Sequence, residues 1–167
     1  MPENNHVLQE NVPAVASDCH LPEDFTLVVL AGGASSRMGK EKSDLILDGQ
    51  TFLEIQIRKG RQLGAKKILI SGYRGERCSE EIVPDRIPDQ GPLGGLESCF
   101  RKAETAKCLV LGVDTPLVPV EELRSLLKYT MEEADKPVTM LCHNGKEESL
   151  MAVYDARLYK EITDFLE

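Results

Sequence analysis

The run Phe25-Thr26-Leu27-Val28-Val29-Leu30-Ala31, which is followed directly by Gly32-Gly33, decides the fold class of this chain. Its residues are apolar or β-branched without interruption, which is typical of a strand buried on both faces of a sheet. The two glycines end this strand and begin a loop. Strands buried in this way belong to parallel sheets, so we predict a parallel sheet with helices on both faces.

Strand-like and helix-like segments alternate along the rest of the chain. The expected strands cover residues 67–71, 81–83, 108–113, 137–142 and 150–154. The expected helices cover residues 51–63, a segment that follows Gly94-Gly95, and a segment that begins near Pro119. Short connections between alternating strands and helices favour right-handed crossovers. We therefore predict an α/β fold, a Rossmann-like three-layer αβα sandwich with a mostly parallel sheet.

Two turns refine this prediction. Gly64 follows the last apolar residue of the first expected helix, so we predict that it caps the C-terminus of that helix. The segment His143-Asn144-Gly145-Lys146 has the composition of a hairpin turn. The last two strands are therefore expected to pair antiparallel, and the pattern accommodates one antiparallel strand in the sheet.

The composition is that of one folded domain. The chain has 167 residues, of which 41% are hydrophobic and 29% are charged, and this is sufficient for a single core. Residues 1–24 are polar and contain Pro2, Pro13 and Pro22. We expect a flexible N-terminal extension over residues 1–24 and one folded domain over residues 25–167.

Charge and cysteine usage exclude several classes of partner. The excess of 28 acidic over 20 basic residues gives a net charge of −8, which would repel a nucleic acid backbone. The sequence contains neither a signal peptide nor an apolar run of membrane-spanning length. The five cysteines are scattered without C-x-x-C spacing, so we expect neither a disulfide framework nor a zinc site. These features predict a cytoplasmic protein that binds neither nucleic acid nor membrane.

The loop after the first strand concentrates groups that bind phosphate. Gly32-Gly33 lets backbone N–H groups approach oxygen atoms closely. Ser35-Ser36 adds hydroxyl donors, and Arg37 and Lys42 add positive charge. The segment is not a Walker A loop, because Glu41 occupies the Ser/Thr position. A tight turn alone has no use for so many donors, so the loop is predicted to bind a triphosphate.

Asp114 follows the expected strand over residues 108–113 directly. Ligands of α/β folds bind beyond the carboxyl ends of the strands, and a hard carboxylate there can hold Mg²⁺ against nucleotide phosphates. The alternative is that Asp114 caps the next helix or stabilises a turn. Its position opposite a glycine-rich loop favours the metal role.

Three segments in this order resemble the motifs of the molybdenum cofactor guanylyltransferases, a family within the nucleotide-diphospho-sugar transferase-like superfamily. Residues 30–42 match L-A-G-G-x-S-S-R-M-G-x-x-K, residues 85–96 match an aspartate followed by G-P-L-x-G, and residues 111–119 match a D-x-P loop. A weaker similarity covers residues 148–154. Three motifs in the family's order are a specific signal, and they extend from residue 27 to about residue 120.

The resemblance implies a fold of the nucleotide-diphospho-sugar transferase type and a Mg²⁺-dependent nucleotidyltransferase. The implied reaction transfers GMP from GTP to Mo-molybdopterin and releases pyrophosphate, in the biosynthesis of the molybdopterin guanine dinucleotide cofactor. The implied catalytic residues are Arg37, Lys42 and Asp114, with Asp114 also the metal ligand. The implied nucleotide-binding residues are Leu30, Ala31, Gly32, Gly33, Ser35, Ser36, Asp85, Gly91, Pro92, Leu93 and Gly94.

The resemblance also assigns roles within this set. Gly32-Gly33 and Arg37 are implied to grip the β and γ phosphates, and Lys42 to stabilise charge at the α phosphate. Asp85 is implied to accept hydrogen bonds from N1–H and the 2-amino group of guanine, although a loop aspartate can equally be solvated. The glycines of residues 91–95 either let the backbone pass close to the base and ribose or shape the entry to the following helix.

Two other functions fit the same sequence. One is a related nucleotidyltransferase: a molybdopterin cytidylyltransferase, a cobinamide-phosphate guanylyltransferase or a sugar-phosphate nucleotidyltransferase. The other is a nucleotide-binding module without turnover, against which the retained Lys42 and Asp114 argue. Members of the resembled family usually continue beyond the last helix into a segment on the acceptor side, and we expect this chain to lack it. A molybdoenzyme or a cofactor-biosynthesis protein is therefore a candidate partner, and the oligomeric state stays open.

Overall fold

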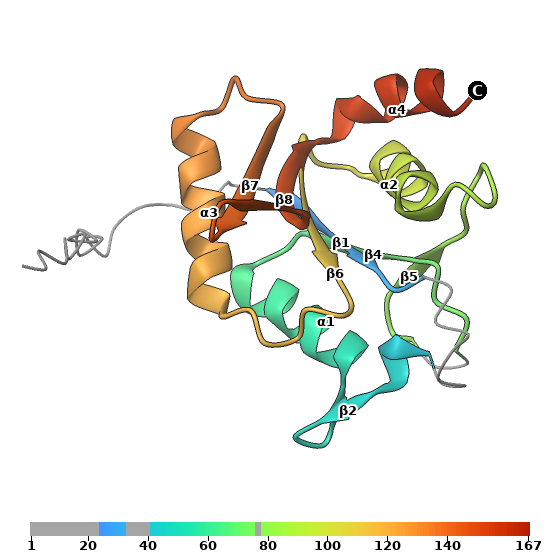
Figure 1. Cartoon of the computed structure of the whole chain (residues 1–167), viewed down its shortest axis with the longest axis vertical. Coiled ribbons are helices and arrows are strands. Elements are labelled where there is room, and N and C mark those ends of the chain that lie inside the picture. The colour runs from blue at the N-terminus through green and yellow to red at the C-terminus, as the bar shows by residue number, and fades with distance from the viewer. Residues whose placement is uncertain (1–23, 33–40, 76–77) are drawn as a thin grey trace, which may run out of the picture.

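The computed structural model describes residues 24–32, 41–75 and 78–167. The expected extension over residues 1–24 therefore lies outside the described residues except for Asp24, which forms an ion pair with Lys66. The described residues form a central sheet with helices on both of its faces (Figure 1). The predicted α/β sandwich with a mostly parallel sheet is confirmed.

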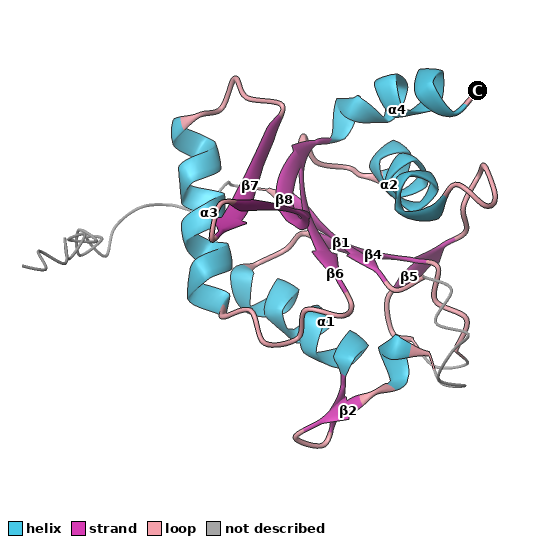
Figure 2. Ribbon diagram, in the orientation of Figure 1, coloured by secondary structure: helices cyan, strands magenta, loops and turns pink. Residues whose placement is uncertain are grey.

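The sheet has six strands in the order β5-β4-β1-β6-β8-β7 (Figure 2). Their bounds are β1 Phe25–Leu30, β4 Lys67–Ser71, β5 Glu81–Val83, β6 Lys107–Gly112, β7 Val138–His143 and β8 Lys146–Asp155. β1 pairs parallel with both β4 and β6, and β5 pairs parallel with β4. Only β8 runs the other way among these six strands, because it pairs antiparallel with both β6 and β7. The expectation of one antiparallel strand and a hairpin is therefore confirmed.

β1 lies at the centre of the sheet, and all six of its residues are buried. Successive side chains of a strand point to opposite faces, so β1 contributes to two separate cores. Leu27 and Val29 join the cluster beneath α1 (Phe52–Leu63) and α3 (Val120–Glu132). Val28 and Leu30 join the cluster beneath α2 (Gly91–Lys102), and α4 (Tyr159–Leu166) packs against the same side. The uninterrupted apolar run of β1 thus has a separate packing partner on each face.

The ends of α1 follow from its sequence. Thr51 is the N-cap and forms a capping box with Glu54, in which each side chain accepts a hydrogen bond from the other residue's backbone N–H. Gly64 ends the helix in the left-handed conformation with φ 81°, as predicted. α3 begins after Pro119, also as predicted, and carries acidic side chains in its first turn.

The start of α2 differs from the prediction. The helix was expected to follow Gly94-Gly95, but it begins at Gly91 and contains both glycines in its first two turns. Gly95 is inside the helix because α2 packs closely on the sheet: a Cβ there would lie 2.2 Å from Ser71 Oγ. The glycine pair therefore marks a close helix-to-strand contact rather than a loop.

Several short elements had no prediction. They are the 3-10 helices Lys42–Asp44 and Ala156–Leu158, the hairpin formed by β2 (Ile46–Leu47) and β3 (Gln50–Thr51), and the helix α4. β8 begins at Lys146 instead of residue 150, because its first four residues continue the hairpin with β7 beyond a register shift. Within the described part of the chain, no helix is long and apolar enough to cross a membrane.

Candidate active site

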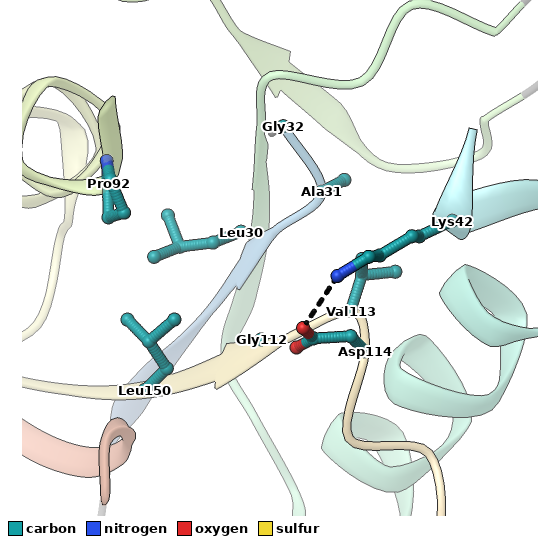
Figure 3. A pocket seen from close by; sticks show the side chains of 9 residues that line it. All are labelled: Leu30, Ala31, Gly32, Lys42, Pro92, Gly112, Val113, Asp114 and Leu150. Atoms are coloured by element: carbon teal, nitrogen blue, oxygen red, sulfur yellow. Dashed lines mark hydrogen bonds and ion pairs between the residues drawn. The ribbon is translucent and has the colours of Figure 1, made fainter. Parts of the chain in front are cut away.

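The carboxyl ends of β1 and β6 open into a crevice on one edge of the sheet. Its lining residues are Leu30, Ala31, Gly32, Lys42, Pro92, Gly112, Val113, Asp114 and Leu150. Figure 3 shows Lys42 and Asp114 on one side of Leu30, and Pro92 and Leu150 on the other. The crevice therefore has a charged half and an apolar half, an arrangement that suits a ligand with both a charged and an apolar part.

Lys42 and Asp114 meet in this crevice although they are 72 positions apart in the sequence. Lys42 Nζ donates a hydrogen bond of 3.1 Å to Asp114 Oδ2, and the two side chains are 50% and 49% exposed. Lys42 begins the 3-10 helix after the glycine loop, and Asp114 follows β6. A cation and a carboxylate are thus held together at the edge where two central parallel strands end.

The glycine loop begins against the end of β4. The backbone N–H groups of Ala31 and Gly32 donate to the carbonyl oxygen of Ser71 at 2.8 and 3.2 Å. Gly32 also lies against Gly72, so a Cβ on Gly32 would be 3.0 Å from Gly72 Cα. Gly32 therefore has a packing role in addition to the phosphate role implied by the sequence. Gly72 was not among the predicted site residues, and only its place directly after a strand signals it.

Four of the predicted phosphate-binding residues are not part of this geometry. Gly33, Ser35, Ser36 and Arg37 lie outside the described residues, within the segment 33–40. Their roles rest on the sequence alone.

Asp85 lies apart from the Lys42–Asp114 pair. Ser71 Oγ donates a hydrogen bond of 3.2 Å to Asp85 Oδ1, and Asp85 Oδ2 is 3.6 Å from the position of a Cβ on Gly94. The carboxylate of Asp85 therefore faces the first turn of α2. Pro92 reaches the crevice from that turn, whereas Gly91, Leu93, Gly94 and Asp85 are not among its lining residues.

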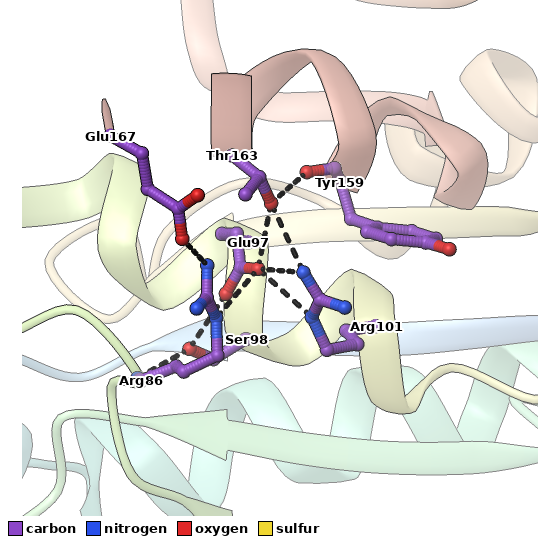
Figure 4. Close-up of polar contacts among 7 residues, drawn as sticks. All are labelled: Arg86, Glu97, Ser98, Arg101, Tyr159, Thr163 and Glu167. Carbon is purple, nitrogen blue, oxygen red and sulfur yellow. Dashed lines mark hydrogen bonds and ion pairs between the residues drawn. The ribbon is translucent and has the colours of Figure 1, made fainter. Parts of the chain in front are cut away.

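The loop that carries Asp85 is anchored by a carboxylate that the sequence analysis missed. Glu97 of α2 is fully buried, and its Oε1 accepts hydrogen bonds from Arg86 Nε at 3.1 Å, Arg101 Nη2 at 2.6 Å and Thr163 Oγ1 at 2.9 Å (Figure 4). Burial raises the pKa of Glu97, but the hydrogen bonds from Arg101, Thr163 and Arg86 outweigh it, and the pKa lies below its ordinary value.

The same network fixes the backbone next to Asp85. The backbone N–H of Arg86 donates to Ser98 Oγ at 2.8 Å, and Ser98 lies next to Glu97 in α2. The guanidinium of Arg86 also pairs with Glu167 at 3.0 Å. The Asp85 loop, α2 and the C-terminal helix are therefore joined through Glu97. Acidic residues inside an amphipathic helix carry no sequence signal of such a role.

The described residues include no group of three or more His, Cys, Asp or Glu side chains that could hold a metal ion among themselves. Asp114 is thus a single carboxylate at the crevice. Mg²⁺ is commonly held by one or two carboxylates together with substrate phosphates rather than by a cage of protein ligands, so Asp114 fits a metal bound together with nucleotide.

The cysteines of the described segments are all free thiols: Cys78, Cys99, Cys108 and Cys142. Burial raises the pKa of Cys99 and of Cys108 to about 12, which keeps both thiols protonated.

Comparisons with known proteins identify the family. A family model described as the MobA-like NTP transferase domain matches residues 27–167. A probable molybdenum cofactor guanylyltransferase of Carboxydothermus hydrogenoformans is 32% identical over 86% of this chain and 72% of its own length.

Solved structures show the same fold. The molybdopterin-guanine dinucleotide biosynthesis protein A of Archaeoglobus fulgidus matches with a TM-score of 0.67 and 23% identity, over 84% of this chain and 72% of that one. A Mycobacterium tuberculosis protein solved in complex with manganese matches with a TM-score of 0.61 and 14% identity, over 83% of this chain and 74% of its own.

Proposed function

Since this chain belongs to the family of MobA-like NTP transferase domains, we propose that it is a molybdenum cofactor guanylyltransferase. The proposed reaction transfers GMP from GTP to Mo-molybdopterin and releases pyrophosphate. The observation that carries the proposal is the pairing of Lys42 with Asp114 at the carboxyl edge of the sheet. Support for the acceptor comes from the names of the relatives, of which the first is 32% identical.

The proposed step is a displacement at the α phosphorus of GTP. An oxygen of the terminal phosphate of Mo-molybdopterin forms a bond to this phosphorus, and the bond to the β-phosphate oxygen breaks with its electron pair leaving on pyrophosphate. The attacking group is already an anion, so no side chain has to act as a strong base. The protein has to align the two groups and neutralise oxygen charge.

Lys42 is proposed to neutralise charge on the α phosphate as it develops. Its ammonium group lies at the crevice and is half exposed, so a phosphate oxygen can replace the carboxylate of Asp114 as its partner. Gly32-Gly33, Ser35-Ser36 and Arg37 are proposed to bind the β and γ phosphates. The described start of this loop, at Gly32, already lines the crevice.

Asp114 is proposed to hold a divalent metal, with Mg²⁺ as the physiological ion. The metal would supply positive charge between the phosphate oxygens and lower the cost of pyrophosphate departure. Support comes from the exposure of the Asp114 carboxylate to the crevice and from its place beyond β6. Manganese in a structure of the same fold is consistent with a divalent ion.

Asp85 is proposed to select guanine. One of its oxygens accepts a hydrogen bond from Ser71, and a carboxylate has further acceptor sites for N1–H and the 2-amino group of guanine. The backbone of Gly91, Leu93 and Gly94 is proposed to pass along the base and ribose, and Pro92 and Leu30 to supply apolar contact. The nearby crevice already includes Pro92 and Leu30.

Calorimetry with Mg·GTP, Mg·CTP and Mg·ATP tests the nucleotide, and release of pyrophosphate on addition of Mo-molybdopterin tests the transfer. Binding of Mg·GTP in preference to the other two, followed by GTP-dependent pyrophosphate release, is the expected result. Asp114→Ala should abolish the release, while Asp135→Ala, at an exposed aspartate after α3, should leave it unchanged. Preference for CTP would identify a cytidylyltransferase, and GTP binding without release would identify a nucleotide-binding module.

A further inference from the structure

Two polar side chains of α1 are buried where an amphipathic helix normally places apolar residues. Gln56 is 0% exposed and Lys59 is 4% exposed. They are three positions apart, so they lie on the same face of the helix. Both are directed at the loop of residues 112–116 that follows β6 and contains Asp114, which we name the Asp114 loop.

Gln56 holds the Asp114 loop at two points. Its Nε2 donates to the carbonyl oxygens of Gly112 at 2.8 Å and Thr115 at 3.1 Å. The hydroxyl of Thr115 closes the loop on itself, because Thr115 Oγ1 donates to the Gly112 carbonyl oxygen at 2.9 Å. Gly112 and Thr115 flank Val113 and Asp114, so the backbone is fixed on both sides of the aspartate.

The orientation of the Gln56 amide shows which of its atoms matters. Its Oε1 is buried and has no hydrogen-bond partner among the residues that the structure describes. Turning the amide over would place Oε1 against the two carbonyl oxygens that Nε2 now binds, which is worse because acceptors would face acceptors. A buried unpaired acceptor is costly and rare. The contacts of this side chain are therefore made by its N–H groups, which are directed at the Asp114 loop.

Lys59 extends the same contact to the next residue of the loop. Its Nζ donates to the carbonyl oxygen of Pro116 at 2.8 Å. Three carbonyl groups of the Asp114 loop, those of Gly112, Thr115 and Pro116, are thus bound by one helix. The first residue of α1 is also tied to the segment that carries Lys42, because the N–H of Phe52 donates to the carbonyl oxygen of Leu45 at 2.8 Å. α1 therefore contacts both the Asp114 loop and the segment that follows Lys42.

From these contacts we propose that Gln56 and Lys59 are positioning residues that hold Asp114 in the conformation that binds the metal–nucleotide complex. The inference rests on the proposed function in one respect, the metal role of Asp114. Side chains that orient a metal ligand commonly contribute about tenfold to hundredfold in metal affinity. Neither Gln56 nor Lys59 lines the crevice, so their proposed effect passes through the Asp114 loop.

The decisive variant is Gln56→Met, which keeps the length and approximate volume of the side chain and removes its donors. Gln62→Met makes the same change at an exposed position of α1, and Ile55→Val perturbs a buried position of α1 whose side chain has no hydrogen-bond donor. Lys59→Met removes the second donor, whereas Lys59→Arg keeps a donor. Thr115→Val removes the hydroxyl that donates to the Gly112 carbonyl oxygen within the loop. This variant replaces Gln56→Met in the test if Gln56→Met does not fold.

Three readouts separate positioning from general destabilisation. Hydrogen exchange measures the opening of residues 113–118, electron paramagnetic resonance measures Mn²⁺ bound in the presence of GTP, and calorimetry measures GTP binding without metal. Gln56→Met should speed exchange in residues 113–118 while exchange in β1 stays unchanged. It should weaken Mn²⁺ binding about tenfold or more, and it should leave metal-free GTP binding unchanged. Lys59→Arg should restore most of what Lys59→Met loses, and Gln62→Met and Ile55→Val should match the native protein.

The proposal is overturned if Gln56→Met and Thr115→Val show the hydrogen exchange and the Mn²⁺ affinity of the native chain. It is also overturned if Ile55→Val weakens Mn²⁺ binding as much as Gln56→Met does. Failure of the proposed function gives a different result. In that case the native chain would release no pyrophosphate or bind no Mn·GTP, and the exchange of residues 113–118 alone would decide whether Gln56 holds the loop.

Discussion

Gly72 and Gly32 meet backbone to backbone where β4 and β1 end. A Cβ on Gly72 would fall 2.5 Å from Gly32 Cα, and Gly72 itself has φ 72°. No side-chain rotation can relieve such an overlap, because both contacting groups belong to the main chain. The first residue of the glycine loop therefore depends on the absence of a side chain at Gly72.

Gly72→Ala is therefore expected to destabilise the fold by about 2 kcal/mol or more, since it combines a left-handed backbone with a steric overlap. It should also weaken GTP binding, because Gly32 has to move. Gly49→Ala is the matched control: Gly49 has φ 79° and no atom within 4 Å of a Cβ. Urea denaturation of both variants measures the difference, and an equal loss of stability would show that the contact with Gly32 contributes nothing.

Lys42→Met should lower kcat for pyrophosphate release by about a hundredfold and change the dissociation constant of Mg·GTP much less. The reason is that the lysine is proposed to stabilise charge that develops on the α phosphate during transfer. Steady-state kinetics with varied GTP separates the two constants. Lys136→Met, at an exposed lysine before β7, should behave as the native chain. A rise in KM at unchanged kcat would instead assign Lys42 to ground-state binding.

Asp85→Asn should weaken Mg·GTP binding by about tenfold or more and narrow the difference between GTP and ATP. An amide in place of the carboxylate offers one acceptor oxygen and presents donors to the donor edge of guanine. Calorimetry with both nucleotides measures the change. Unaltered discrimination between GTP and ATP would remove Asp85 from base recognition and leave it as a partner of Ser71 only.

The ionisation of Glu97 should make the stability of the fold depend on pH. Its pKa is lowered in the folded protein, so its contribution is fully present above the ordinary value of 4.5 and is lost as pH falls below that value through the folded pKa. Glu97→Gln should cost about 2 kcal/mol at neutral pH, because it removes the negative charge that accepts hydrogen bonds from two partly exposed arginines. The difference in the free energy of unfolding between the native chain and the variant should shrink as the pH falls below 4.5 and through the lowered pKa of Glu97. Urea denaturation across this pH range measures the free energy of unfolding of both proteins, with Glu132→Gln on α3 as the control. A difference between the native chain and Glu97→Gln that did not depend on pH would contradict the ionised state of Glu97.

The thiols should fall into two reactivity classes. Cys99 and Cys108 are fully buried, and burial raises the pKa of each to about 12, so neither should react with a thiol reagent in the folded chain. Cys142 is exposed and should react quickly. A Cys19→Ser, Cys78→Ser background removes the cysteine outside the described residues and the partly buried Cys78, so that only these two classes are counted. Labelling before and after addition of denaturant counts both classes, and rapid labelling of Cys99 or Cys108 without denaturant would indicate local opening of α2 or β6.

Much of the fold was predictable because its signals are local. The apolar run of β1, the capping glycine at Gly64 and the hairpin turn at Asn144-Gly145 each depend on neighbouring residues, and each prediction is confirmed. The start of α2 was predicted wrongly because the glycine at position 95 is required by the close approach of Ser71, which is distant in the sequence, and not by the end of a loop. A helix with an internal glycine pair looks like a loop until the sheet beneath it is known.

The site divides in the same way. Lys42 and Asp114 could be named from motifs, and the structure brings them together in one crevice. Gln56 and Glu97 could not be named from the sequence. Their neighbours in the sequence do not indicate the carbonyl groups that Gln56 binds or the guanidinium groups that Glu97 binds. Side chains that support a site are chosen by tertiary contacts, and a single sequence does not display those contacts.

The central place of β1 has a consequence for how the chain is made. β1 is the first strand of the sheet to be synthesised, yet its partners are residues 67–71 and 107–112. A ribosome adding about 5–20 residues per second leaves this apolar strand unpaired on its second edge until β6 has emerged. Pairing over such separations is slow, and an exposed apolar strand promotes aggregation. The strand at the centre of the finished sheet is thus only partly paired during much of the synthesis of the chain.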